Sequence, residues 1–100
     1  MIINDFIGAI NDTRLVELTF DSKSKGIITR TYAPMDYAPS RRSSSPELKL
    51  HFYDTHSGHP VPLTENQIIT LRILEAKFSP ENIVTWTPNW YTSRDWGSKS

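Results

Sequence analysis

Three side chains that could bind an anionic ligand occur at a spacing of two residues. Lys49, His51 and Tyr53 alternate with apolar residues over Leu48–Asp54. A period of two places them on the outward face of a strand, with the apolar residues facing inward. A cation, an imidazole and a phenol on one face could cradle a nucleotide, because phosphate needs the charge and a base can stack on the rings. The alternative is an ordinary solvated sheet face.

Three arginines could add positive charge to such a site. Arg30 alternates with apolar residues along an earlier predicted strand, and its planar guanidinium could bind phosphate or simply lie at the surface. Arg41 and Arg42 fall in a predicted loop, Ala38–Pro46, which contains four serines and two prolines. They could contact phosphate, belong to a phosphorylatable tether, or only solubilise the loop.

Metal binding and catalysis are not predicted. His51, His56 and His59 do not form a rigid ligand set, because two of them lie in a turn that contains Gly58. The chain has no glycine-rich phosphate loop, nucleophile elbow or His-Glu-x-x-His pair. The scattered carboxylates that flank the predicted strands fit turn or cap roles; they are Asp36, Glu47 and Asp54. We therefore expect a non-enzymatic protein without a metal or cofactor.

Aromatic residues are concentrated near the C-terminus. Trp86, Trp90 and Trp96 lie within the last fifteen residues, with Tyr91 among them. They could stack on bases or form an interaction surface, or they could fold back to seal a small core. Arg94 and the adjacent Asp95 could form a local ion pair, which contributes little when exposed.

The elements that must position these residues are a short helix and several strands. Four apolar residues share a helical face near the N-terminus: Ile3, Phe6, Ile7 and Ile10. From Leu15 the period changes to two, and a polar turn that ends at Gly26 separates this strand from the next. Further strands are predicted over Ile27–Pro34, Leu48–Asp54 and Val61–Leu63.

The segment Thr64–Phe78 fits two local structures equally well. Thr64 and Gln67 have the spacing of a helical capping box, and apolar residues follow at helical intervals. Ile69, Leu71 and Ile73, however, alternate with polar residues as they would in a strand. The local pattern alone does not decide between them.

This order of elements resembles the WYL domain, an Sm-like, SH3-type β-barrel of bacterial regulators. The matching positions are Ala9-Ile10, Val16, Leu18, Phe20, Arg30, Pro34, Gln67-Ile68, Leu71, Leu74 and Phe78. The resemblance implies that Thr64–Phe78 is a turn followed by a strand. It also implies a mainly β fold with a short N-terminal helix (α+β), built as a small five-stranded barrel over residues 1–78. Residues 79–100 are expected to form a partly packed Trp-rich extension with frayed last residues.

The same resemblance implies a ligand-binding function. Such domains look like regulatory sensors that bind nucleotides or single-stranded nucleic acid through a basic and aromatic patch. The tripeptide that names the family falls on Leu48-Lys49-Leu50, of which only the final Leu is kept, and the late Arg falls on Gln67. The predicted ligand-binding residues are Arg30, Lys49, His51, Tyr53, Gln67, Arg41 and Arg42. The sequence lacks the helix-turn-helix that usually precedes the domain, so regulation is expected to act through a partner that carries a DNA-binding domain.

Composition limits the remaining functional classes. One hundred residues are enough for one domain, and the basic and acidic residues balance at 11 each. Any affinity for nucleic acid must therefore come from a local patch. The absence of cysteine suits a reducing cytoplasm, and no stretch has the features of a signal peptide or a membrane span.

The sequence thus predicts a cytoplasmic, non-enzymatic regulatory module that binds an anionic ligand. The ligand would be a nucleotide or single-stranded nucleic acid, and its binding would modulate a transcription or nucleic-acid-processing partner. The alternative is a protein-interaction or homo-oligomerisation module that uses its strand edges and Trp-rich tail.

Overall fold

The fold is mainly β, with one antiparallel sheet of five strands and a single helix longer than one turn among the residues described. The computed structural model describes residues 2–39 and 47–100. Its strand order is β4-β3-β2-β1-β5, so β4 and β5 lie at the two ends of an open sheet. In chain order the elements are α1 (Ile2–Asp12), β1 (Arg14–Asp21), β2 (Ile27–Pro39), β3 (Leu48–Asp54), β4 (His59–Leu63), the 3-10 turn η1 (Glu65–Gln67), β5 (Ile68–Lys77), the short helix α2 (Pro80–Ile83) and the 3-10 turn η2 (Gly97–Lys99).

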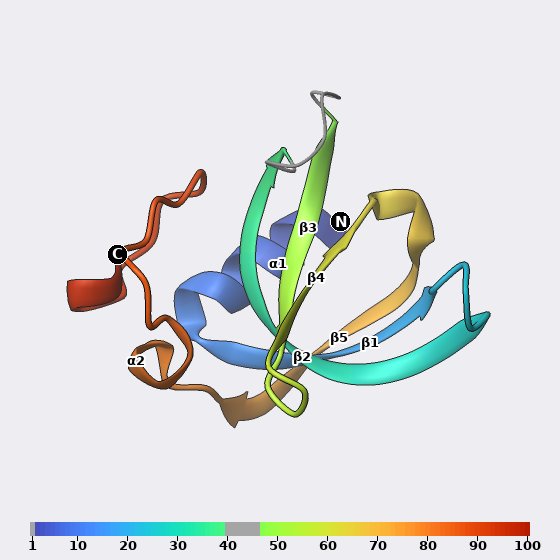
Figure 1. The fold of residues 1–100 in the computed structure, drawn as a ribbon, viewed down its shortest axis with the longest axis horizontal. Coiled ribbons are helices and arrows are strands. Elements are labelled where there is room, and N and C mark those ends of the chain that lie inside the picture. The colour runs from blue at the N-terminus through green and yellow to red at the C-terminus, as the bar shows by residue number, and fades with distance from the viewer. Residues whose placement is uncertain (1, 40–46) are drawn as a thin grey trace.

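The long strand β2 belongs to both halves of the sheet. Its residues Ile27–Tyr32 pair with β1, whereas Ala33–Pro39 pair with β3. The register shifts between Pro34 and Asp36, and residues 32–36 are all buried instead of alternating between two faces. In Figure 1 the first half of β2 runs alongside β1 and β5, while its second half turns away with β3 and β4.

Pro34 lies where β2 changes neighbours. It is fully buried and stands opposite Phe52 of β3. Proline has no backbone N–H to donate, so in sheets it is confined to edges, strand starts and bulges. At this position the missing donor costs little, because β1 pairing has already ended at Tyr32.

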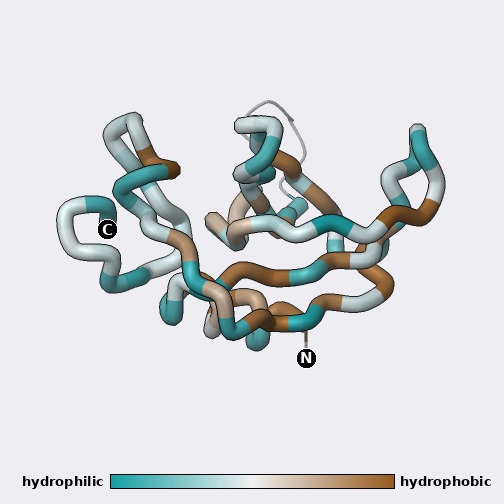
Figure 2. Tube along the Cα trace, turned by 90° about the horizontal axis from the view of Figure 1, so that it is seen from below, coloured by the Kyte–Doolittle hydropathy of each residue, from teal (hydrophilic) through white to brown (hydrophobic). Residues whose placement is uncertain are grey.

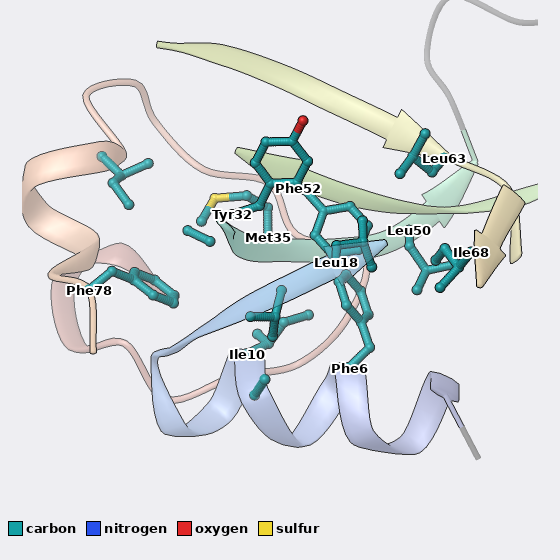
Figure 3. Packing of buried hydrophobic residues seen from close by; sticks show 14 of the residues in the cluster. Phe6, Ile10, Leu18, Tyr32, Met35, Leu50, Phe52, Leu63, Ile68 and Phe78 are labelled. Atoms are coloured by element: carbon teal, nitrogen blue, oxygen red, sulfur yellow. The ribbon is translucent and has the colours of Figure 1, made fainter. Parts of the chain in front are cut away.

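The core lies between α1 and the curved sheet. Phe6 and Ile10 are fully buried and point from α1 toward Leu18 and Phe52 of the strands (Figure 3). The rings of Phe6 and Phe52 meet edge to face at 5.0 Å, a favourable geometry for two aromatic side chains. Figure 2 shows the hydrophobic stretches along the central strands, with hydrophilic residues at the turns and in the C-terminal segment.

The elements predicted from periodicity mostly agree with this structure. Phe6 and Ile10 are buried on the predicted helix face, and the inward residues of β1 are buried as expected. The prediction that β2 ends at Pro34 is wrong, because the strand continues to Pro39. Leu48 was expected to face inward, yet it is 37% exposed at the start of β3.

The ambiguous segment after β4 combines features of both predicted patterns. Thr64 and Gln67 do form a capping box, but it closes only the short turn η1, and the chain then continues as the strand β5. The backbone N–H of Thr64 donates to Gln67 Oε1 at 3.1 Å, and Gln67 Nε2 donates to the carbonyl of Asp21 at 3.0 Å. Gln67 therefore ties the start of β5 to the end of β1.

Replacing Gln67 tests this structural role. We expect Gln67→Ala to lower the free energy of unfolding by about 1 kcal/mol, because it removes a cap and a hydrogen bond between two strands. Urea denaturation provides the measurement. Glu65→Ala, an exposed change in the same turn, is the control and should have a smaller effect; equal effects would contradict the assigned role.

Candidate ligand-binding groove

An open groove of about 470 Å³ separates the outward face of β3 and β4 from the C-terminal segment, by which we mean residues 84–100. His51 and Tyr53 of β3 stand opposite Pro62 and Pro60 of β4. Residues directly opposite on antiparallel strands share a face, so these four side chains form one wall. Two indoles of the C-terminal segment line the groove from its other side. We call it the aromatic groove and define it by His51, Tyr53, Pro60, Pro62, Trp86 and Trp90.

The imidazole of His51 is held by the neighbouring strand. Its Nε2 lies 2.8 Å from the carbonyl oxygen of Ala38 in β2. A carbonyl oxygen can only accept a hydrogen bond, so Nε2 carries the proton, and in the neutral ring Nδ1 is left as an acceptor. The ring is half-buried. His51 can therefore offer a fixed aromatic face together with one hydrogen-bond acceptor.

Trp86 and Trp90 form the wall contributed by the C-terminal segment. Their rings are 6.3 Å apart in an edge-to-face arrangement. Trp90 is half-buried, and its indole N–H donates to the carbonyl of Lys99 at 2.7 Å. Trp86 remains 46% exposed, so much of its ring is open to an incoming planar group.

A buried ion pair fixes this segment against β2. Arg94 Nη2 lies 3.0 Å from Asp36 Oδ1, and the side-chain exposures are 0% for Arg94 and 11% for Asp36. The guanidinium also donates to the carbonyls of Met35 and Thr92. Asp36 in turn accepts hydrogen bonds from the backbone N–H groups of Tyr91 and Thr92, each at 2.9 Å. Both charges are therefore satisfied by several partners.

Two indoles complete the surroundings of Arg94. Its guanidinium carbon lies 4.0 Å from the centre of the Trp90 ring and 4.5 Å from that of Trp96. These distances are typical of cation–π contacts, which strengthen when the groups are desolvated. Burial lowers the pKa of Arg94 to about 10, while the charge and hydrogen bond of Asp36 act in the opposite direction. Arg94 therefore remains charged at neutral pH.

Trp96 anchors the same segment to the helix. It is buried, and its indole N–H donates to the carbonyl of Ile10 in the last turn of α1 at 2.8 Å. The Ile10 carbonyl also accepts a hydrogen bond from the backbone N–H of Thr13 at 3.2 Å, so the indole of Trp96 is its second donor at the end of the helix. Its ring also meets Phe78 edge to face at 5.6 Å. One tryptophan thus seals the core while Trp86 and Trp90 line the groove.

The structure brings together only part of the predicted ligand-binding set. The outward face of β3 carries the half-buried residues Lys49, His51 and Tyr53, as predicted. Leu50 and Phe52, on the other face of the same strand, are fully buried. His51 and Tyr53 line the aromatic groove, and Lys49 lies two residues from His51 on the same face.

The other predicted residues do not line this groove. Arg30 is exposed on the half of β2 that pairs with β1. Its guanidinium donates a hydrogen bond to the carbonyl of the preceding residue, Thr29. Gln67 lies in η1 and bonds to Asp21 and Thr64. Arg41 and Arg42 lie outside the described residues.

Sequence patterns missed the residues that organise the groove. Asp36 was expected in a turn or cap, and Arg94 was expected to pair with Asp95; instead Asp36 is buried within β2 and pairs with Arg94. The partners are 58 positions apart, so no local pattern could have matched them. The spacing of Pro60 and Pro62 was a usable signal, since it places both on one face of β4.

Comparison of the chain with family models, curated proteins and solved structures finds no match. Within residues 2–39 and 47–100 there is no cluster of three or more His, Cys, Asp or Glu side chains that could hold a metal ion. None of the helices described is both long and apolar enough to cross a membrane.

Removing one member of the buried ion pair should strongly destabilise the protein. We expect Asp36→Ala to lower the free energy of unfolding by about 3–5 kcal/mol, because it leaves the guanidinium of Arg94 buried without its partner. Urea denaturation followed by tryptophan fluorescence measures the change.

The exposed ion pair between Arg72 and Glu17 offers a matched control. Its atoms lie 3.3 Å apart, with side-chain exposures of 69% and 40%. Glu17→Ala should change the free energy of unfolding by no more than about 1 kcal/mol. If Asp36→Ala were no more costly than Glu17→Ala, the C-terminal segment would not depend on the buried pair.

Proposed function

We propose that this chain is a non-enzymatic regulatory module that binds a nucleotide or single-stranded nucleic acid in the aromatic groove. The observation that carries the proposal is the convergence of His51, Tyr53, Trp86 and Trp90 on one groove. Aromatic faces stack on nucleobases, and the proteins that bind single strands use such platforms beside positive charge. The volume of about 470 Å³ lies within the range of small-molecule sites.

The charges around the groove suit a phosphate-bearing ligand. Asp36 is the one carboxylate among the lining residues, and its charge is met by Arg94. The wall is therefore close to neutral despite containing an acid. Lys49, on the face shared with His51 and Tyr53, is the cation we assign to a phosphate. Arg30 is left out of this assignment because it lies on the other half of β2.

The lining residues offer little for catalysis. Asp36 is committed to an ion pair, and the proton on Nε2 of His51 is donated to a backbone carbonyl. A general acid must donate a proton to the substrate and a general base must accept one, and neither Asp36 nor Nε2 of His51 is available for these roles. The arrangement favours binding over reaction, as the proposal requires.

The fold supports the proposed relationship to WYL-like modules. The sheet is open, and the features that support the relationship to a small Sm-like, SH3-type barrel are the N-terminal helix and the long strand β2 shared between two halves of a five-stranded sheet. In the proposal the barrel acts in the cytoplasm on a partner that carries the DNA-binding or nucleic-acid-processing activity. A ligand between β3 and the C-terminal segment would contact both, so its binding would stabilise their relative position.

Stacking on Trp86 gives the first test. We expect Trp86→Ala to weaken binding of adenosine monophosphate and short single-stranded oligonucleotides about tenfold or more, since stacking contributes roughly 1–3 kcal/mol per base. A backbone amide NMR titration measures affinity and locates the site. Tyr91→Ala is the control, because Tyr91 is 68% exposed and does not line the groove. Equal losses in both variants, or no binding by the wild type, would refute the proposed site.

The salt dependence of binding tests the role of Lys49. If Lys49 contacts one phosphate of a single strand, Lys49→Gln should reduce the slope of log affinity against log salt by about 0.7. Lys25→Gln and Arg30→Gln are controls at exposed positions away from the groove, and both should keep the wild-type slope. A reduced slope in Arg30→Gln, with none in Lys49→Gln, would move the phosphate contact to the first half of β2.

A further inference from the structure

The two edges of the sheet differ in their ability to pair with another strand. The edge strand β4 carries Pro60 and Pro62 within five residues, so its backbone lacks two of the N–H groups that a ladder requires. The other edge strand, β5, runs for ten residues without proline, and in the described chain it pairs with β1 alone. An edge of this kind presents a row of unpaired backbone donors and acceptors.

The edge of β5 is also apolar around Leu71. Its register with β1 is regular from Thr70 to Ile73 and shifts next to Ile69, between Thr19 and Phe20 of β1. Ile69 is 50% exposed and Ile73 is 38% exposed, while Leu71 between them is half-buried. Leu71 and Ile73 stand opposite Leu18 and Val16 of β1, both fully buried. They therefore lie on the core face of the sheet, at the margin where the sheet ends.

We propose that this edge pairs with β5 of a second copy of the chain, in an antiparallel register centred on Leu71. In that register Leu71 stands opposite its own copy, and Ile69 stands opposite Ile73 in both directions. Every apolar side chain of the exposed row then meets another apolar side chain, which is the favourable case for a cross-strand pair.

Neighbouring registers are worse for charge and for burial. Centring the pair on Arg72 sets this arginine against its own copy, and like charges directly opposite destabilise a sheet. Centring it on Ile73 sets Leu71 against Glu75. The prolines of β4 disfavour head-to-tail pairing of β4 with β5 of another copy. The symmetric pairing of two β5 strands therefore closes at two copies.

Two short strand edges bury only a small area, so we expect the dimer to be weak.

Sedimentation velocity over about two decades of protein concentration tests the association. The wild type should rise from the mass of one chain toward that of two, without larger species. Ile69→Lys and Ile73→Lys should weaken the dimer at least about tenfold, because pairing would bury an unpaired charge. Ile27→Lys is the matched control: Ile27 is 67% exposed and belongs to β2. A wild type that stays monomeric, larger assemblies, or an equal effect of Ile27→Lys would overturn the proposal.

Single cysteines test the register, because the chain has no native cysteine. Opposite residues in antiparallel strands have Cα atoms about 4.5–5.5 Å apart, within disulfide range. Leu71→Cys should therefore cross-link with itself under mild oxidation, whereas Thr70→Cys should not. In a mixture of Ile69→Cys and Ile73→Cys, disulfides between the two variants should form in preference to disulfides between two copies of the same variant. This measurement does not depend on how well Leu71→Cys folds. Preferential cross-linking through Thr70→Cys would contradict the register.

Discussion

The buried pair of Asp36 and Arg94 is the interaction on which the candidate site depends. A buried ion pair offsets its desolvation cost only when the geometry is good and the remaining polar atoms are bonded. Here the carboxylate also receives backbone N–H groups, and the guanidinium donates to backbone carbonyls and lies against two indoles. The pair joins the second half of β2 to the C-terminal segment. Without that attachment, the segment that carries Trp86 and Trp90 would be held mainly by the contacts of Trp96 with Ile10 and Phe78, and one wall of the aromatic groove would lose its support from β2.

The bend of β2 explains why the pair can exist at all. The strand leaves β1 after Tyr32, so the carbonyls of Met35 and Tyr37 lie beyond the stretch that pairs with β1. The C-terminal segment supplies donors to both: Arg94 bonds to Met35, and the Thr92 hydroxyl bonds to Tyr37 at 3.3 Å. A segment with little regular structure thereby covers backbone groups that would otherwise need another partner. The register shift between Pro34 and Asp36 lies at this bend, where the Asp36 carboxylate meets that segment.

Local periodicity predicted the elements whose surroundings repeat, and it failed where the surroundings change. The α1 face, the inward residues of β1 and the alternation in β3 follow from spacings of 3.6 and 2. In β2 residues 32–36 are buried in succession, since two halves of the sheet and the C-terminal segment enclose them. A pattern based on a straight strand therefore ended β2 too early. The same bend explains the candidate site, because it keeps Arg30 on the half that pairs with β1 while His51 and Tyr53 belong to the other half.

The aromatic groove and the edge of β5 lie at opposite ends of the strand order. The groove uses β3, β4 and the C-terminal segment, whereas β5 is separated from β3 by β2 and β1. A second copy paired with β5 would therefore leave the groove accessible, and each chain of the dimer would keep its own site.

Coupling between the edge of β5 and the aromatic groove would have to pass through β2, the strand that contacts both halves of the sheet, or through Phe78, which follows β5 and packs on Trp96. Because Trp96 and Trp90 both contact Arg94, the second route leads from the β5 edge to the ion pair and then to the groove wall. An effect of dimerisation on ligand affinity would implicate this route, and independence of the two would mean that the ion pair holds the wall rigidly in either state.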